Sequence, residues 1–373
     1  MKPIRVLIAD DSSLARGLLL AFLEGEPDIT VVGEARNGRE AVEMAQALKP
    51  DLVTMDLEMP QMDGLAAIEE IMCSKAVPIL VVSGVADAQK AYEAVRRGAL
   101  EVVSKPDYTP EQAADFVAKV RLLAGVSVIT RMRSRTAMPL PHPIAATPPT
   151  VAAPAPWATL KPLPAFAHPL MPPASQPPAD PAPDRYVRVF AIASSTGGPQ
   201  ALAQILPALP AGFPAPVLIA QHIAEGFAAG MADWLGTLCA LPVRLASEGE
   251  LVQPATIYIA PSEKHLAVSA GRRLTLLERR SGDIYRPSCD ALLDSVAEVW
   301  GRQAIGIILT GMGSDGAKGM ARIRGKGGLT LAQDEKTSVI YGMNRVAVDS
   351  GAVERVLPVE AIAGEMRRLV GVA

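Results

Sequence analysis

Short apolar runs alternate with helix-length amphipathic segments over the first third of the chain. The apolar runs occupy residues 4–10, 30–35, 52–56, 78–84 and 100–105. The helical patterns between them occupy residues 13–25, 38–48, 64–72 and 89–98. Strands that are almost wholly apolar, and that alternate with helices, are typical of a parallel sheet covered on both faces. The pattern therefore predicts an α/β domain of five βα units over residues 1–125.

The last half of the chain repeats this style with a different spacing. Apolar runs that predict strands occupy residues 187–194, 214–223, 255–261, 304–311, 328–334 and 351–358. Helical patterns occupy residues 199–209 and 289–301. We expect a second α/β domain over residues 185–373, doubly wound and built on a mainly parallel sheet.

Residues 126–184 follow neither pattern. Stretches such as "PLPHPIAATPPT" are rich in proline and alanine, almost uncharged and without periodicity. Such a composition cannot bury a core and favours extended polyproline segments. We predict a flexible linker here, joining the two domains.

Composition narrows the functional classes. The chain is 49% hydrophobic and 20% charged with a net charge of −3, so it lacks the basic surface of a nucleic-acid-binding protein. No apolar run reaches the roughly 18 residues of a membrane span, and "MKPIRVLIADDSS" lacks the pattern of a signal peptide. The three cysteines show no metal-ligand spacing. We expect a reduced, cytoplasmic protein that neither binds nucleic acid nor inserts into membranes.

Acidic and basic residues end several strands of the first domain. Asp10 and Asp11 follow the first strand, Asp56 the third, Ser83 ends the fourth, and Lys105 follows the fifth. The carboxyl ends of parallel strands share one edge, so these side chains should converge. Clustered carboxylates favour a hard cation such as Mg²⁺, which can neutralise an incoming phosphoryl group. The alternative, in which each acid caps a helix or faces solvent, explains a single Asp better than the whole set.

This set resembles a two-component receiver domain, and "MDLEMPQMDG" is similar to the phosphoacceptor loop of that family. The resemblance implies that Asp56 accepts a phosphoryl group from a histidine kinase. It also implies a Mg²⁺ site made of Asp10, Asp11 and Asp56.

The resemblance further implies that Ser83 and Lys105 contact the phosphoryl oxygens, and that the Lys105–Pro106 bond is cis. One position departs from the family pattern. Val102 stands where receivers usually carry an aromatic residue three positions before the lysine. The side-chain relay that this aromatic residue provides is therefore in question.

Polar residues also follow three strands of the second domain. Ser195, His222 and Asp315 each come after a different apolar run, so a parallel sheet would bring them to one edge. A nucleophilic serine needs a base and a group that orients the base. These three residues predict a Ser–His–Asp triad.

Other residues compete for these roles. His142 and His168 lie in the predicted linker, and His265 fits a supporting or packing position better than that of the base. Ser194 would point away from Ser195 if the strand continues. Cys289 is expected to face the core at the start of a helix rather than to be a reactive thiol.

Glycines in "SSTGGP" and "TGMGSDG" make two tight turns beside the predicted nucleophile. Exposed N–H groups in such turns can bind a phosphate or an oxyanion, which predicts an oxyanion hole near Thr196 and Met312. The first turn lacks the G-x-G-x-x-G spacing of a dinucleotide site. The chain also lacks the G-x-S-x-G motif and residue order of an α/β-hydrolase.

Seven segments of the second domain resemble the catalytic domain of the chemotaxis protein-glutamate methylesterases, the CheB family. They are "ASSTGGP", "QHI", "APSEKHL", "RPSCDALLDSVA", "ILTGMGSDGAKGM", "AQDEKTSVIYGM" and "GAVERVLP". The resemblance implies Ser195 as nucleophile, His222 as base and Asp315 as its orienting partner. It places Thr196 and Met312 at the oxyanion hole. Asn344 stands where the family usually has proline.

Together the two resemblances imply a phosphorylation-activated enzyme. It would hydrolyse glutamyl methyl esters on methyl-accepting chemoreceptors and deamidate selected glutamines at the same site. The esterase itself would need no cofactor. The alternative is a phosphorylation-dependent binding module whose catalytic half only docks partners, and the complete set of triad residues disfavours it.

Overall fold

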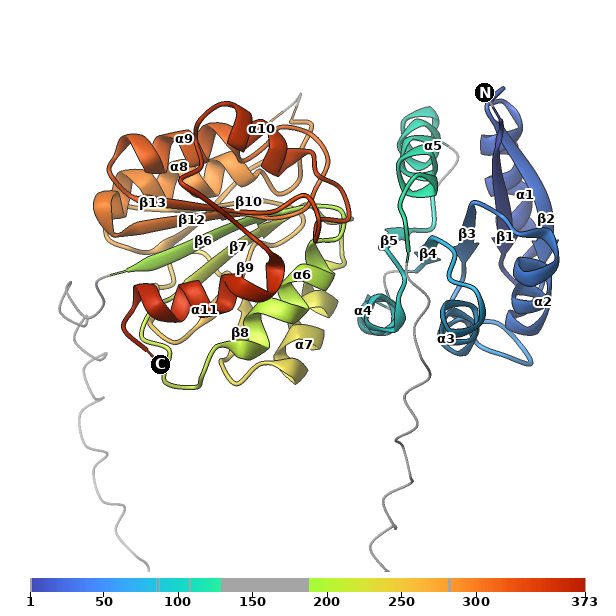
Figure 1. Ribbon diagram of the computed structural model, residues 1–373, viewed down its shortest axis with the longest axis horizontal. Coiled ribbons are helices and arrows are strands. Elements are labelled where there is room, and N and C mark those ends of the chain that lie inside the picture. The colour runs from blue at the N-terminus through green and yellow to red at the C-terminus, as the bar shows by residue number, and fades with distance from the viewer. Residues whose placement is uncertain are drawn as a thin grey trace, which may run out of the picture. The chain divides into compact units, whose positions relative to one another are not determined.

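The computed structural model describes residues 2–84, 86, 88–106, 109–128, 188–280 and 283–372. The predicted linker at residues 126–184 lies outside them except for residues 126–128. The described residues form two α/β parts, one before and one after that segment in the sequence (Figure 1).

The first part is a five-stranded parallel sheet, as the sequence predicted, and its strand order is β2-β1-β3-β4-β5. Its elements alternate without exception. They are β1 (Ile4–Ala9), α1 (Ser13–Glu24), β2 (Ile29–Ala35), α2 (Gly38–Leu48), β3 (Leu52–Met55), α3 (Gly64–Ser74), β4 (Ile79–Ser83), α4 (Ala88–Arg97), β5 (Glu101–Ser104) and α5 (Pro110–Ala124).

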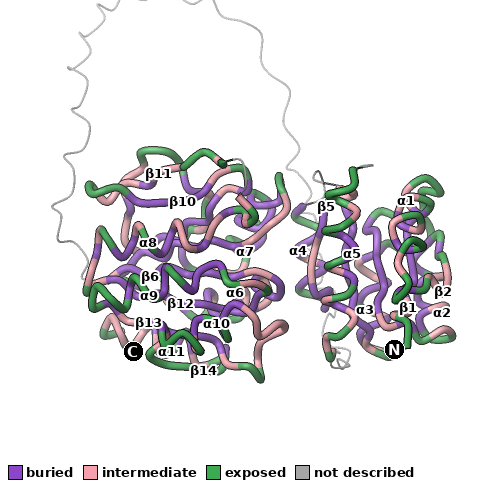
Figure 2. The backbone as a smooth tube through the Cα atoms, turned by 90° about the horizontal axis from the view of Figure 1, so that it is seen from above, coloured by how far each residue is buried: buried purple, intermediate pink, exposed green. Residues whose placement is uncertain are grey.

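Local sequence signals explain where these helices begin. Ser12, Asn37, Asp63 and Thr109 each precede a helix, and each side chain accepts a hydrogen bond from a backbone N–H of the first turn. Alternate strand residues then pack against opposite helical layers. Apolar residues of α1 and α5 cover one face of the sheet, and those of α2, α3 and α4 cover the other. The central strands β3 and β4 are accordingly buried throughout, whereas the edge strand β2 is mostly intermediate or exposed (Figure 2).

The second part is a seven-stranded sheet in which every neighbouring pair is parallel, with the order β14-β13-β12-β6-β7-β9-β8. Helices α8, α9 and α10 lie on one face, and α6, α7 and α11 on the other (Figure 1). The strands are β6 (Val189–Ser194), β7 (Val217–Gln221), β8 (Val243–Leu245), β9 (Ile257–Ile259), β12 (Ala304–Ile308), β13 (Leu329–Gln333) and β14 (Arg355–Leu357). The helices are α6 (Gly198–Ile205), α7 (Ala228–Leu238), α8 (Cys289–Trp300), α9 (Ala317–Gly325), α10 (Met343–Asp349) and α11 (Val359–Leu369).

Three short strands were not predicted from the apolar pattern. They are β8, whose residues are only partly buried, and the antiparallel pair β10 (His265–Val268) and β11 (Leu274–Leu277). Strands of three or four residues carry too few apolar positions for their period to stand out. The doubly wound, parallel architecture of the domain was predicted correctly.

The strand order of the larger sheet creates a crevice at β6. This strand pairs with β12 on one side and with β7 on the other, so the connections leave it in opposite directions. Ligands of open α/β sheets bind outside the carboxyl ends of the strands at such a point. Ser195 and His222 directly follow β6 and β7, and Thr310 is the second residue after β12. Among the described residues, no helix is both long and apolar enough to cross a membrane.

Candidate active site and phosphoacceptor pocket

The five polar residues predicted at the edge of the smaller sheet include a tight charge cluster. Lys105 Nζ lies 2.9 Å from Asp10 Oδ2 and 3.1 Å from Asp56 Oδ2. Carboxylate oxygens of Asp10, Asp11 and Asp56 all lie within 4.8 Å of one another. Asp10 and Asp56 are buried and Asp11 is exposed. The cluster therefore offers oxygen ligands and an open side, as a Mg²⁺ site requires.

Burial and like charge act together on Asp56. They raise the pKa of its carboxyl group above the usual range, with burial the larger cause and Asp10 the second. Burial alone would lower the pKa of Lys105, but its bonds to Asp10 and Asp56 raise it. The pocket thus holds three carboxylates, of which Lys105 binds two, and a cation would offset the remaining negative charge.

Ser83 completes the pocket with an unused hydroxyl. The residue is buried at the end of β4, and its Oγ has no hydrogen-bond partner in the described part of the chain. Buried hydroxyls are normally bonded, so this hydroxyl remains available to a ligand. The prediction that the Lys105–Pro106 bond is cis is wrong. Among the described residues, the one cis peptide bond is Arg286–Pro287. Lys105–Pro106 is trans, the form that X–Pro bonds favour.

The turn after β6 presents Ser195 at the edge of the larger sheet. Ser195 N–H donates to Thr310 O at 3.0 Å, and Gly198 N–H donates back to Ser195 O at 2.7 Å. Gly197 holds φ at +80°, and a Cβ there would lie 2.6 Å from Val339. Only glycine satisfies both conditions. The turn then leads directly into α6, and a helix start leaves N–H groups without an intrahelical partner.

Ser194 and Ser195 have different surroundings, as strand alternation predicts. Ser194 is buried, and its Oγ donates to Gln221 Oε1 at 2.6 Å. Ser195 is partly exposed. The Gln221 amide also donates to the carbonyl oxygens of Ser195 and His222, each at 2.8 Å. Gln221 thus ties the two loops together, a role that the sequence reading of "QHI" missed.

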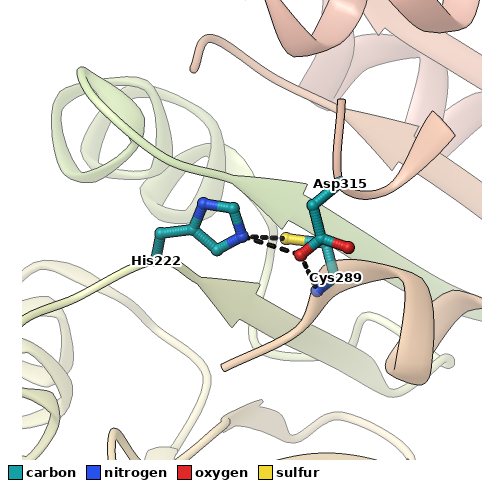
Figure 3. Close-up of side chains that lie close together, drawn as sticks. All are labelled: His222, Cys289 and Asp315. Carbon is teal, nitrogen blue, oxygen red and sulfur yellow. Dashed lines mark hydrogen bonds and ion pairs between the residues drawn. The ribbon is translucent and has the colours of Figure 1, made fainter. Parts of the chain in front are cut away.

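His222 and Asp315 form a direct hydrogen bond. His222 Nε2 lies 2.8 Å from Asp315 Oδ2 (Figure 3). A carboxylate only accepts, so Nε2 carries the hydrogen and Nδ1 is unprotonated in the neutral ring. No hydrogen bond from a described residue reaches Nδ1. The ring also stacks on Tyr285 with centroids 4.9 Å apart and planes inclined by 14°, which restricts its rotation.

Asp315 is held at the start of helix α8. Its carboxylate accepts bonds from the N–H groups of Cys289 and Asp290 at 2.6 and 2.9 Å, and from the Ser288 hydroxyl at 3.2 Å. Burial alone would raise the pKa of Asp315, but the bonds from His222 and from the helix N–H groups lower it. The positive end of the helix dipole favours the same charge. Asp315 therefore stays ionised beside His222.

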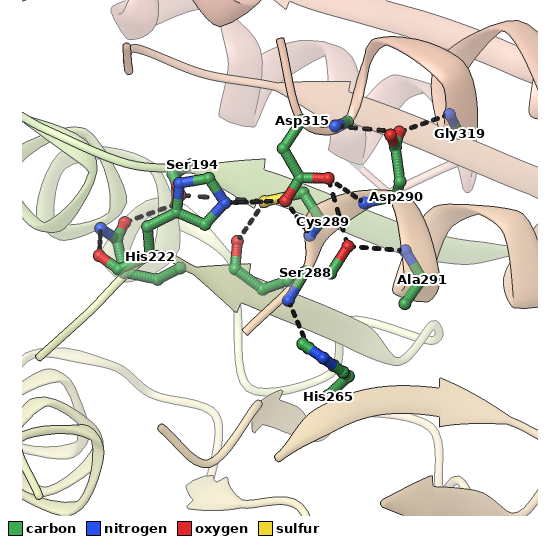
Figure 4. Close-up of polar contacts among 12 residues, drawn as sticks. Ser194, His222, His265, Ser288, Cys289, Asp290, Ala291, Asp315 and Gly319 are labelled. Atoms are coloured by element: carbon green, nitrogen blue, oxygen red, sulfur yellow. Dashed lines mark hydrogen bonds and ion pairs between the residues drawn. The ribbon is translucent and has the colours of Figure 1, made fainter. Parts of the chain in front are cut away.

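Two carboxylates link the starts of helices α8 and α9 to each other. Asp290 in the first turn of α8 accepts bonds from Gly316 and Gly319 N–H at 2.9 and 2.7 Å (Figure 4). Asp315, just before α9, binds the start of α8 in return. Each carboxylate satisfies N–H groups that a helix end leaves open. The exchange fixes the loop that carries Asp315 relative to α8.

His265 does not contact Asp315 directly but supports it through Ser288. Its Nδ1 accepts a bond from Ser288 N–H at 2.9 Å, so its Nε2 donates to Asp283 Oδ2 at 2.8 Å (Figure 4). Both ring nitrogens are thus engaged away from Ser195. His265 supports the Ser288 segment, which in turn binds Asp315, in agreement with the expectation for this histidine.

Comparisons with known proteins give the family. A profile of the CheB methylesterase family matches residues 190–366, and a profile of response regulator receiver domains matches residues 6–117. A protein-glutamate methylesterase/protein-glutamine glutaminase of Paramagnetospirillum magneticum is 52% identical over 99% of this chain and 96% of its own length. The chain belongs to the CheB methylesterase family.

Further similar proteins align with the whole chain or with one of its two parts. A Myxococcus xanthus protein-glutamate methylesterase/protein-glutamine glutaminase is 42% identical over 98% of this chain and 96% of its own length. The Thermotoga maritima CheB methylesterase catalytic domain is 38% identical, covers 49% of this chain and 98% of its own chain, and has a TM-score of 0.48. The solved response regulator domain of Thermotoga maritima CheB is 36% identical, covers 34% of this chain and 99% of its own, and has a TM-score of 0.32.

In this CheB chain, Thr310 supports the predicted site although the sequence did not indicate it. Thr310 Oγ1 donates to Thr196 O at 2.9 Å and accepts from Ile340 N–H at 2.9 Å, so it braces the turn that holds the predicted oxyanion position. Met312, the other predicted oxyanion residue, is 54% exposed in its loop. Sequence reasoning missed Thr310 because a threonine after a strand carries no specific signal.

Asn344, the departure from the CheB pattern, is buried and bonded. Its amide donates to Gln333 O at 3.0 Å and to Ser338 Oγ at 2.8 Å. Gln333 Oε1 in turn accepts the Thr310 N–H at 2.9 Å. Asn344 therefore braces the loop behind Thr310 and does not contact His222 or Asp315.

Proposed function

We propose that Ser195, His222 and Asp315 are the catalytic triad of this CheB family member. As a member, the chain is a protein-glutamate methylesterase/protein-glutamine glutaminase with a receiver domain, and chemoreceptor adaptation is the process that the family implies. The observation that carries the assignment is the bond from His222 to a buried, ionised Asp315 beside the Ser195 turn.

The hydrogen-bond pattern supports Nδ1 of His222 as the nitrogen that acts as the base. Nε2 is bound to Asp315, so Nδ1 accepts the proton from Ser195 Oγ as the oxygen attacks the ester carbonyl. Asp315 stabilises the imidazolium that forms and keeps the ring in the required tautomer. The stacked Tyr285 limits rotation of the ring during the transfer.

Backbone N–H groups near Thr196 and Met312 would stabilise the tetrahedral oxyanion. The proton on His222 then passes to the leaving methoxy oxygen, and methanol departs. A water molecule, deprotonated by the same nitrogen, hydrolyses the acyl-enzyme to glutamate and free serine. With a glutamine substrate the leaving group is ammonia and the remaining steps are the same. The esterase needs no cofactor for either reaction.

The receiver pocket would control this enzyme through Asp56. Its carboxylate is the proposed phosphoryl acceptor, and Asp10, Asp11 and Asp56 would hold Mg²⁺. The cation supplies neutralisation of the incoming phosphoryl charge. We expect the Ser83 hydroxyl, which has no hydrogen-bond partner among the described residues, to bind a phosphoryl oxygen. Lys105 would bind another phosphoryl oxygen after it gives up one of its carboxylate contacts.

The partners follow from these two sites. The substrates we propose are methylated or amidated glutamyl side chains of methyl-accepting chemoreceptors, and the phosphodonor is a histidine kinase. We place the protein in the cytoplasm, where its three unpaired cysteines would remain reduced.

Methanol release from methylated receptor membranes tests the enzyme assignment. Ser195→Ala should lose several powers of ten in rate, because triad members act as a unit. Ser194→Ala is the matched control, since its hydroxyl is bound to Gln221 and should be dispensable for the chemistry. Equal methanol release by Ser195→Ala and the native protein would leave only the binding-module alternative.

A further inference from the structure

Cys289 lies directly against the proposed His–Asp pair. Its Sγ is 3.4 Å from His222 Nε2 (Figure 3). The thiol also lies 3.3 Å from Ala220 O, to which it donates its hydrogen. The sulfur therefore presents lone pairs toward His222. The proposed reaction uses neither the sulfur nor its proton.

A thiol, an imidazole nitrogen and a carboxylate oxygen form a characteristic ligand set. Cys289 Sγ, His222 Nε2 and one Asp315 oxygen all lie within 4.8 Å of one another. Thiolate and imidazole favour Zn²⁺ and related cations, whereas Mg²⁺ prefers oxygen alone. We infer that Cys289, His222 and Asp315 form an inhibitory binding site for Zn²⁺ or another thiophilic divalent cation.

The three ligand atoms lie close enough to occupy three corners of a tetrahedron after a small adjustment. Ligand atoms on one Zn²⁺ lie about 3.3–3.6 Å apart, given bond lengths of about 2.0–2.3 Å. The Sγ–Nε2 distance of 3.4 Å is already in this range. The Nε2–Oδ2 distance of 2.8 Å must open by roughly 0.5 Å, which follows once the hydrogen between the two atoms is gone. A water molecule would occupy the fourth position.

Metal binding at this site is balanced by proton movement. The Cys289 thiol loses its proton to solvent as the Zn–S bond forms. The neutral His222 ring gives its Nε2 lone pair to the metal, so its one hydrogen moves to Nδ1. No oxidant or reductant is involved, and the metal replaces the hydrogen that Nε2 shares with Asp315.

The transfer of the His222 hydrogen to Nδ1 explains why a bound metal would inhibit the esterase. Nδ1 is the nitrogen that takes the Ser195 proton in the proposed mechanism, and a protonated Nδ1 cannot accept one. Asp315, as a metal ligand, also no longer stabilises an imidazolium. The inhibition rests on the proposed function, whereas metal binding itself does not. The two are therefore tested separately.

Cobalt spectroscopy tests binding without any activity. Co²⁺ replaces Zn²⁺ and shows an intense near-ultraviolet charge-transfer band only when a thiolate is bound. We expect this band in full-length Ser195→Ala protein with excess Mg²⁺, which fills the oxygen site of the receiver. The band should disappear in Ser195→Ala/Cys289→Ala and persist in the matched control Ser195→Ala/Cys239→Ala. Cys239 caps the end of α7 and has no part in the cluster.

Two spectroscopic results would overturn the site. One is the absence of a thiolate band in the Ser195→Ala protein, and the other is a band that survives loss of Cys289. Circular dichroism verifies the folding of each variant. Cys289→Ser, which keeps the size of the side chain but removes the soft ligand, replaces Cys289→Ala if the latter does not fold.

Inhibition is tested on the active protein. Zn²⁺ should stop methanol release, and a chelator should restore it. Cys289→Ala should raise the Zn²⁺ concentration for half-inhibition at least about tenfold, with each variant normalised to its own rate without metal. Cys239→Ala should leave that concentration unchanged. Equal sensitivity of Cys289→Ala and the native protein would refute an inhibitory role for the cluster, even if Co²⁺ binds there.

Discussion

The two histidines of the catalytic domain differ in which ring nitrogen is free. His222 uses Nε2 for Asp315, and no described residue binds its Nδ1. His265 uses Nδ1 for Ser288 N–H and Nε2 for Asp283, so neither nitrogen can receive a proton from serine without breaking a bond. Chemistry and support are thus divided between two side chains of the same type.

This division predicts unequal effects of alanine substitution. His222→Ala should be nearly inactive, because no other group replaces the base. His265→Ala should keep much of the rate, with a modest loss in kcat from a less ordered Ser288 segment. Steady-state methanol release measures both variants. The opposite ranking would transfer the role of base to His265.

Asp56 is expected to be the phosphorylated residue. Asp56→Asn should abolish labelling by acetyl phosphate or by a histidine kinase, and chelation of Mg²⁺ should abolish labelling of the native protein. Asp10→Asn, which removes a neighbouring acid, should weaken labelling without moving it. Undiminished labelling of Asp56→Asn would mean that another residue accepts the phosphoryl group.

Because the pKa of the Asp56 carboxyl group is raised, Asp56→Asn should also change the stability of the fold. A carboxyl group whose pKa is higher in the folded than in the unfolded protein destabilises the fold above that pKa, and the cost disappears as pH falls through it. At neutral pH without Mg²⁺, Asp56→Asn should therefore raise Tm by a few degrees. Mg²⁺ should raise Tm of the native protein and have little effect on the variant. A lower Tm for the variant at neutral pH would contradict this.

Helix α8 connects the stability of the fold to catalysis. Its first residue and its N-cap both bind Asp315, and the N-cap Ser288 also accepts the Ala291 N–H at 3.3 Å. A single serine thus caps the helix and holds the carboxylate that orients the base.

Ser288→Ala should consequently have two effects. Loss of the cap should cost about 1 kcal/mol of unfolding free energy, and loss of the bond to Asp315 should lower kcat with little change in KM. Thr109→Ala is the matched control, because Thr109 caps α5 with the same 3.3 Å contact but lies in the receiver. It should lose similar stability and keep its kcat. A Ser288→Ala variant with unchanged kcat would show that the cap does not position Asp315.

The two domains of the whole chain are expected to act on each other through the predicted linker. The family resemblance implies that the unphosphorylated receiver covers the catalytic cleft and that phosphorylation loosens it. The predicted linker between them occupies residues 126–184. Effective concentration falls roughly as the −3/2 power of linker length, so a doubling weakens inhibition only about threefold.

Deletion of residues 1–130 should therefore raise basal esterase activity, and phosphorylation of the intact protein should approach that level. Methanol release with and without a phosphodonor measures both. The phosphodonor should have no effect on Asp56→Asn, which serves as the control. An isolated catalytic domain no faster than the unphosphorylated whole would mean that activation comes from the phosphorylated receiver itself, as by recruitment of the receptor.

The sequence by itself determined the architecture and the residues at the strand ends. Long, almost wholly apolar strands such as Val189–Ser194 are visible because burial on both faces demands an unbroken apolar run. Polar residues directly after such strands, Asp56 in the smaller sheet and His222 in the larger one, could be assigned to the carboxyl edge of their own sheet because parallel strands share that edge.

Only the tertiary structure decided how these residues are connected. The bond from Asp315 to the start of α8, the Gln221 amide between two loops, and the contact of Cys289 with His222 join residues far apart in the chain. Such contacts depend on side-chain orientation and on which helix packs beside which loop, and neither has a local periodicity. The nitrogen of His222 that remains free for the serine proton follows from those same contacts.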